Sequence, residues 1–249
     1  TFNGRRYGPR IEFHRLVRTL QTRAADHVAV PSHYLKALVS TWGVSRDRIT
    51  TIYNAIDTSE IDALASGDST EIVTVCRQVE WKGIRGLIDA VALVEDVPNV
   101  HLNVVGDGPH RDRFEQYAAA TLDAGRYTFH GRVPHETVLE MLASNRIFAL
   151  NSTYEGLPHA VLEAMACGLP AVVSDAGGNP EVVADGETGF VVEQADAEAF
   201  ADRFRRLLTD DQLWEQLHEQ SQQRLGSHFD QDRMWDEYER LLRSVVGDR

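Results

Sequence analysis

The sequence has few cysteines, few lysines and no long apolar run. Cys76 and Cys167 are too few for a disulfide framework, and no Cys/His cluster has zinc-ligand spacing, so we expect no metal site. No stretch is long enough to cross a bilayer, and residues 1–10 are polar and Arg-rich, unlike a signal peptide. These absences indicate buried thiols in a cytoplasmic protein. A peripheral position at the inner membrane face stays open for a longer form.

Charge narrows the range of partners. The formal net charge is −13, which argues against nucleic acid as a partner. Lysine occurs only at Lys36 and Lys82, and the other basic residues are arginines. An acidic, lysine-poor composition is typical of a salt-adapted organism or a GC-rich genome. The chain begins with Thr1 rather than methionine, so we expect an excised or processed product.

Alternating strand and helix patterns predict the fold. Helical periodicity appears at 84–94, about 109–123, 134–144 and from about Pro158. Regular strand–helix alternation predicts an α/β fold, a Rossmann-like parallel six-stranded sheet with helices on both faces. Its expected strands are short, β-branched segments near 70–76, 100–105, 127–130, 146–150, 170–174 and 188–192.

The two ends of the chain differ from this pattern. Residues 9–62 predict helix, strand, helix, strand and turn, and two strands do not form a self-sufficient sheet, so we expect a partial second α/β domain. Residues 230–246 predict an amphipathic helix, which packs either on the main domain or on the partial one. We therefore expect a remnant and hinge at 1–57, a Rossmann-like domain at 58–228, and a C-terminal helix at 229–249 that packs back toward the remnant.

The turn EGLP, residues 155–158, carries the strongest chemical signal. It follows a buried strand and leads into a helix, whose first turn suits Pro158. Ligands of parallel sheets bind beyond the carboxyl ends of the strands, where free N–H groups of a helix start attract anions and hydroxyls. Glu155 and Glu163 have E-x7-E spacing, and a carboxylate can accept two hydroxyls of a sugar or ribose. An isolated pair of this kind is usually solvated, but the surrounding glycine, proline and small residues favour a binding site.

A cationic pair is expected at the same edge of the sheet. Arg77 ends the first strand of the main domain, and Lys82 opens the next helix. Two cations there can hold a diphosphate and stabilise the charge that grows on a leaving nucleotide. Two solvated surface cations are the alternative, which becomes weaker beside Glu155.

Three further turns carry weaker signals. A nicotinamide fingerprint at residue 106 fails, because Arg111 occupies the place of its third glycine. The sequence at 177–180, followed by Glu181, favours a turn and helix cap over a ligand site. Two turns remain candidates for bordering a nucleotide base, although the second is nearly as well explained as a plain loop: Gly106, Asp107 and Gly108, and Gly131, Arg132 and Val133.

Taken together, EGLPHAVLEAMACGLP and the upstream R-x4-K resemble glycosyltransferase family four, the retaining group with the GT-B fold. The segment IYNAID, residues 52–57, resembles the hinge motif of that family, with Ala55 where glycine is usual. Cys76 stands where glycine commonly precedes the arginine. The likeness covers most of the chain, as the C-terminal half of a GT-B fold plus the tail of its N-terminal domain.

This resemblance implies a metal-independent hexosyltransferase without a cofactor, which moves a sugar from a UDP- or GDP-linked donor to an acceptor hydroxyl with retention. Arg77 and Lys82 would bind the diphosphate, and Glu163 would hold the ribose. The donor sugar would contact Glu155, Gly156, Leu157 and Pro158. The acceptor can be a glycan, a lipid-linked sugar or a small molecule. Family members read it with an N-terminal domain of which only about 1–53 is present, so we expect little or no transfer by this chain alone.

Other functions stay open. The chain can be a nucleotide-sugar-binding module without turnover. A sugar-nucleotide epimerase of the same fold would release an altered sugar without needing an acceptor. A pyridoxal-type phosphorylase would need a cofactor lysine, and neither Lys36 nor Lys82 has that context.

Overall fold

The larger part of the molecule is one parallel sheet. A computed structural model describes residues 8–61, 65 and 67–247. The first seven residues of the expected remnant and the last two of the expected C-terminal helix lie outside this range. The strand order is β5-β4-β3-β6-β7-β8, with every pairing parallel. The six strands are β3 (Glu71–Val75), β4 (His101–Val105), β5 (Tyr127–Gly131), β6 (Ile147–Leu150), β7 (Ala171–Ser174) and β8 (Gly189–Val192).

Burial explains why these segments form strands. Every residue of β6 and β7 is buried, as expected for central strands covered on both faces. The edge strand β5 instead carries exposed and half-buried residues. Each strand lies within one residue of the predicted segment, which confirms the six-stranded α/β sheet.

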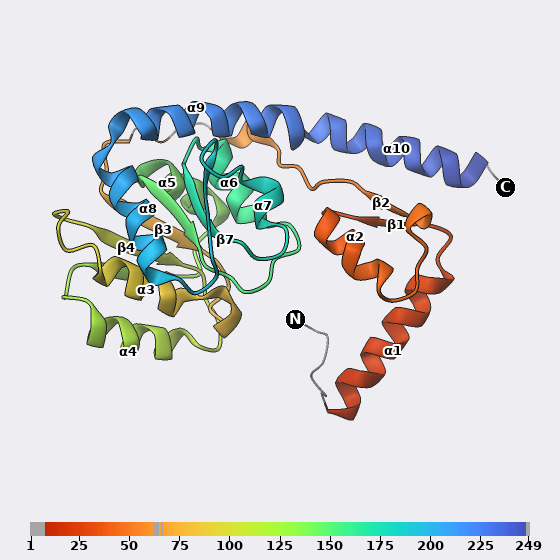
Figure 1. The fold of residues 1–249 in the computed structure, drawn as a ribbon, viewed down its shortest axis with the longest axis horizontal. Coiled ribbons are helices and arrows are strands. Elements are labelled where there is room, and N and C mark those ends of the chain that lie inside the picture. Colours follow the sequence, from red (N-terminus) through yellow and green to blue (C-terminus); the bar gives the residue numbers. More distant parts are fainter. Residues whose placement is uncertain (1–7, 62–64, 66, 248–249) are drawn as a thin grey trace.

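Helices cover both faces of the sheet (Figure 1). One face carries α3 (Ile84–Ala92), α4 (Arg111–Thr121) and α8 (Ala197–Thr209). The other carries α5 (His135–Ser144), α6 (His159–Ala166) and α9 (Asp211–His228), and α7 (Asn179–Val182) is a short helix between β7 and β8. None of the helices in the described part is long and apolar enough to traverse a bilayer.

A smaller group of elements precedes the sheet. This N-terminal unit comprises α1 (Pro9–Ala24), β1 (Val28–Val30), α2 (His33–Ser40) and β2 (Ile49–Thr51). Its two strands pair in parallel over a small core of their own, formed by Val30, Val39, Val44 and Ile49. The last helix, α10 (Gln231–Gly247), continues from α9 toward this unit (Figure 1), and Glu237 and Leu241 line a hollow together with Thr50 and Thr51. The expected three-part division of the chain stays a prediction.

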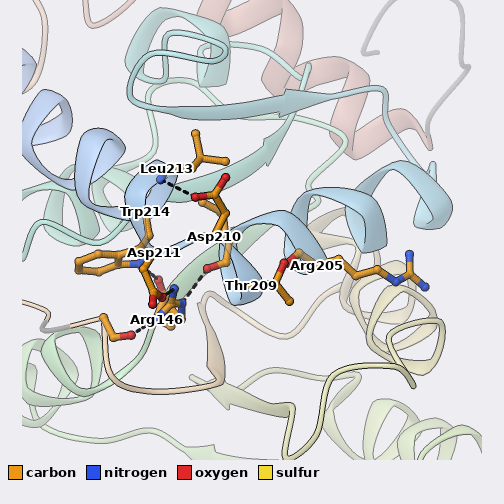
Figure 2. A network of polar contacts seen from close by, with 9 residues as sticks. Arg146, Arg205, Thr209, Asp210, Asp211, Leu213 and Trp214 are labelled. Carbon is orange, nitrogen blue, oxygen red and sulfur yellow. Dashed lines mark hydrogen bonds and ion pairs between the residues drawn. The ribbon is translucent and has the colours of Figure 1, made fainter.

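Arg146 joins several elements at the amino edge of the sheet (Figure 2). It precedes β6 and is buried, with Nε 2.6 Å from the carbonyl oxygen of Leu207 and Nη2 2.5 Å from Asp211 Oδ1. It also donates to the carbonyl oxygen of Gly67, while its own carbonyl accepts from Trp214 Nε1 at 2.7 Å. One side chain therefore ties the linker before β3 to both α8 and α9.

We predict that Arg146→Met lowers the free energy of unfolding by about 2 to 4 kcal/mol, because two buried carbonyl groups lose their donor. The matched control is Asp211→Ala. The Asp211 side chain is 86% exposed, so losing this ion pair should cost about 1 kcal/mol or less. Urea unfolding of both variants measures the difference, and equal losses would contradict the assignment of the stabilisation to the buried carbonyl bonds.

Candidate functional site

Three loops meet where the order of the sheet reverses. The chain passes from β3 outward to β4 and β5 on one side, and later from β6 outward to β7 and β8 on the other. The carboxyl ends of β3 and β6 therefore flank the switch point, where ligands of open parallel sheets bind. The loops that follow β3, β6 and β7 contain the predicted cations, the predicted Glu155 turn and the two glycines at 177–178, respectively.

The first two of these loops interlock through backbone. The N–H of Thr153 donates to the carbonyl oxygen of Trp81 at 2.7 Å. Gly83 has a φ of +65°, and a Cβ there would lie 1.8 Å from the carbonyl oxygen of Asn151. A side chain at residue 83 would therefore be strained twice, by its backbone conformation and by the neighbouring loop. The glycine after Lys82 lets the two loops approach each other.

Lys82 and Glu155 form an ion pair between these two loops. Their Nζ and Oε1 atoms are 2.6 Å apart, with side-chain exposures of 20% and 10%. An ammonium group has three donors, so two remain for phosphate oxygens, and the carboxylate keeps lone pairs for hydroxyls. Cys76 lies beside the pair, and burial raises the pKa of its thiol to about 11, so it is protonated and not nucleophilic near neutral pH.

The backbone of Glu155 rests on Gly177 and Gly178. The N–H of Gly178 donates to the carbonyl oxygen of Glu155 at 3.0 Å. A Cβ on Gly177, whose φ is +61°, would lie 2.0 Å from that same oxygen. The sequence predicted a turn and helix cap here. The structure adds that this turn supports the backbone of Glu155.

Arg77 faces a neighbouring cavity. Its lining includes a second cation, so two guanidinium groups border one hollow at the carboxyl edge. Planar guanidinium groups suit phosphate oxygens, which they bind with two parallel hydrogen bonds. The lining residues are Val75, Cys76, Arg77, Gly106, Asp107, Gly108 and Arg132. Both predicted base-bordering turns thus contribute to the cavity that contains Arg77.

Gln78 holds that cavity together, and sequence reasoning missed it. It is fully buried, and its Nε2 donates to the carbonyl oxygen of Gly106 at 2.7 Å. Its backbone N–H donates to the carbonyl oxygen of Asp107 at 2.9 Å, and a Cβ on Gly108 would lie 2.3 Å from the Gln78 carbonyl. No pattern in the sequence marks it, because its partners lie about thirty residues away.

Glu163 lies apart from the other predicted groups. Its carboxylate is 3.9 Å from His135 Nδ1 and borders a small hollow with Asp57 of the linker. Burial raises its pKa above the ordinary value of 4.5. Among the described residues, no hydrogen bond or ion pair joins Glu163 to Lys82, Glu155 or Arg77. The structure brings Lys82 and Glu155 into contact and places Arg77 and Glu163 in two separate hollows.

The remaining predicted residues differ in what they can offer. Leu157 is buried in the core, so only its backbone can face a ligand. Pro158 is the N-cap of α6 rather than a residue of its first turn, since the helix begins at His159. Gly156 has the side chain of Leu35 close by. Gly131 has a φ of +70°, and Val133 packs partly against the core.

Two sequence families match this chain. The profile described as "Glycosyl transferases group 1" matches residues 56–224, and that described as "Glycosyltransferase Family 4" matches residues 1–60. The first of these alone covers more than half of the chain and includes the loops that follow β3, β6 and β7.

Individual curated proteins are similar in sequence to most of this chain. Lipopolysaccharide core biosynthesis glycosyltransferase LpsE of Rhizobium meliloti is 33% identical over 190 residues, which is 76% of this chain and 54% of the relative. N-acetyl-alpha-D-glucosaminyl L-malate synthase of Bacillus anthracis is 30% identical over 167 residues, 67% of this chain and 43% of that protein. The chain spans about half the length of the curated relatives it matches.

Solved structures share the fold. Sucrose-phosphate synthase from Thermosynechococcus elongatus superposes with a TM-score of 0.86 at 25% identity, over 96% of this chain and 63% of that one. Anabaena HepE in complex with UDP-glucose gives a TM-score of 0.84 at 23% identity, over 92% and 67%. The arrangement of the sheet and the N-terminal unit is therefore one found in longer proteins.

We predict that Glu163→Gln stabilises the ligand-free protein at neutral pH. A carboxyl whose pKa is raised on folding favours the protonated form, so its contribution to stability is lost as pH rises from 4.5 through the raised value. Glutamine removes that loss, and the gain should shrink as pH falls toward 4.5. Thermal unfolding midpoints between pH 4.5 and 8 measure it. Glu136→Gln, on the exposed side of α5, is the control, and a destabilised Glu163→Gln at pH 8 would contradict the prediction.

Proposed function

The chain belongs to the family 4, group 1 glycosyltransferases with the GT-B fold, and from that membership we propose that it binds a nucleotide-diphosphate sugar for hexosyl transfer to an acceptor hydroxyl. The contact between Lys82 and Glu155 at the switch point is the observation that carries this proposal. In this contact, a cation that can bind phosphate lies within hydrogen-bond distance of a carboxylate that can accept hydrogen bonds from sugar hydroxyls. The chain spans about half the length of the curated relatives, which are named as a glycosyltransferase and a synthase.

The proposed transfer retains the anomeric configuration. The acceptor oxygen attacks the anomeric carbon from the face that the diphosphate leaves, and the carbon–oxygen bond to phosphate breaks with its electron pair on the leaving group. A phosphate oxygen takes the acceptor proton. Lys82 and Arg77 stabilise the negative charge on the diphosphate, which is why we propose a reaction without metal or cofactor.

Donor recognition is divided among the hollows of the site. We assign the donor sugar to Glu155 and the backbone of residues 156–158, and the ribose hydroxyls to Glu163. The base would lie along the turns at 106–108 and 131–133. HepE structures contain UDP, glucose or UDP-glucose, which supports a UDP-linked donor, and a GDP-linked one fits the same cation pair.

Location and acceptor are part of the same proposal. Both cysteines are free and buried, which suits a reducing, cytoplasmic compartment. A lipid-linked acceptor would place the proposed transfer at the inner membrane face, whereas a small-molecule acceptor would not.

We predict that Lys82→Met and Arg77→Met each weaken UDP binding at least tenfold, because a charge-assisted bond to phosphate contributes about 1.5 to 3 kcal/mol. Isothermal titration of the 249-residue chain with UDP measures the affinities. Arg243→Met, an exposed cation of α10, is the matched control and should bind as the parent does. Equal affinities of all three variants would overturn the assignment of the diphosphate to this edge.

We predict that the 249-residue chain transfers sugar poorly or not at all on its own. The reason is that it spans about half of its relatives, and its described N-terminal unit contains one pair of strands. Incubation with UDP-glucose and simple sugar acceptors, followed by mass spectrometry, tests this. Turnover comparable to that of a complete transferase would contradict it, and release of an altered sugar without acceptor would indicate an epimerase.

A further inference from the structure

Glu181 connects the sheet domain to the N-terminal unit. It lies on α7, and its carboxylate accepts hydrogen bonds from the backbone N–H groups of His33 at 2.7 Å and Tyr34 at 2.8 Å. It also accepts from the hydroxyl of Tyr53, on the linker, at 3.0 Å. Three donors nearly 150 and 130 residues away thus converge on one side chain.

The bonds complete the start of a helix. The first N–H groups of α2 have no partner within the helix. The Ser32 hydroxyl accepts from Leu35 N at 3.1 Å, and Glu181 accepts from the two residues between them. A carboxylate is also favoured at the positive end of the helix dipole. The sequence predicted a turn and helix cap for the segment at 177–180, and the structure adds that Glu181 caps a helix in another unit of the molecule.

Two further contacts fix the positions of Glu181 and of its partner Tyr53. Arg224 of α9 donates to the carbonyl oxygens of Glu181 at 2.9 Å and Val182 at 2.8 Å. Burial, and to a smaller extent the hydrogen bond to Glu181, raises the pKa of Tyr53 to about 12, so its hydroxyl stays a donor at neutral pH. Tyr53 also packs edge-on against Phe229, with ring centroids 5.4 Å apart.

Helix α2 lies directly against the turn that carries Glu155. The Tyr34 and Tyr154 rings are 5.9 Å apart, and Leu35 Cδ1 lies 3.1 Å from where a Cβ on Gly156 would be. Helix α7, which carries Glu181, directly follows the two glycines that support the Glu155 backbone. The N-terminal unit and the turn are thus connected through α7 and the loop before it.

We propose that Glu181 is a positioning residue that latches α2 onto the sheet domain and thereby fixes the turn at 154–157 for the sugar part of the donor. The link to the sugar rests on the proposed function of that turn. The latch itself rests only on the three hydrogen bonds and the packing of α2.

Hydrogen exchange tests the latch without any ligand. In Glu181→Ala, the amide protons of His33 and Tyr34 should exchange at least tenfold faster, and in Glu181→Gln, which keeps one acceptor oxygen, less so. Glu187→Ala, an exposed glutamate beyond α7, is the matched control and should leave both rates unchanged. Unchanged rates in Glu181→Ala would overturn the latch. So would an acceleration that the buried amides of β7 share equally, since it would reflect general destabilisation.

Titration with UDP and UDP-glucose tests the consequence for the donor. Glu181→Ala should weaken UDP-glucose several-fold and leave UDP within twofold of the parent, because only the sugar lies at the turn. Tyr53→Phe, which removes one of the three bonds, should give a smaller change in the same direction. Equal weakening of both ligands, or of neither, would overturn the coupling to the turn. If the parent chain binds neither ligand, the proposed function fails, while the exchange rates still decide the latch.

Discussion

The ion pair between Lys82 and Glu155 is the contact on which the rest of the site depends. It joins the loops after β3 and β6, the two neighbouring strands at which the strand order of the sheet reverses. Each partner follows a strand whose interior residues are buried, so the positions of both charges depend on the core. A partly buried ion pair stabilises a protein only if further polar groups complete its hydrogen bonds, because desolvation of the two charges is costly. The spare donors of Lys82 and lone pairs of Glu155 are therefore suited to a ligand that brings anionic oxygens and hydroxyls together.

Close backbone approach makes this contact possible. Gly83 admits the carbonyl of Asn151, and Gly177 admits that of Glu155, each at a distance that excludes a side chain. Gln78 performs the related task for the cavity of Arg77 with hydrogen bonds. At the opposite edge of the sheet, Arg146 secures the linker and the outer helices, so that the two ends of the sheet are stabilised by separate networks.

The sequence was sufficient for the strands and for the convergence of Lys82 and Glu155, because buried β-branched runs and parallel connections follow local rules. It was insufficient for Gln78, Arg146 and Glu181, whose partners are remote backbone groups. A carboxylate that caps a helix some 150 residues away leaves no periodic pattern and no motif. The segment at 177–181 predicted a turn and helix cap, and only the fold shows that Glu181 caps α2.

The acidic surface and the cationic site can coexist for a physical reason. The chain carries a net charge of −13, yet at physiological ionic strength exposed charges are screened beyond about 8 Å. Arg77, Lys82 and Arg132 would act at contact distance on the proposed donor, so the distant exposed carboxylates would affect it little. Within the site, Glu155 is already paired and Asp107 accepts from the N–H of Gly108. The Lys82–Glu155 pair is neutral as a whole, and Asp107 offsets one of the two arginines that share its cavity, so these five groups keep one net positive charge at the carboxyl edge. The overall charge sets mainly how the protein behaves at a distance.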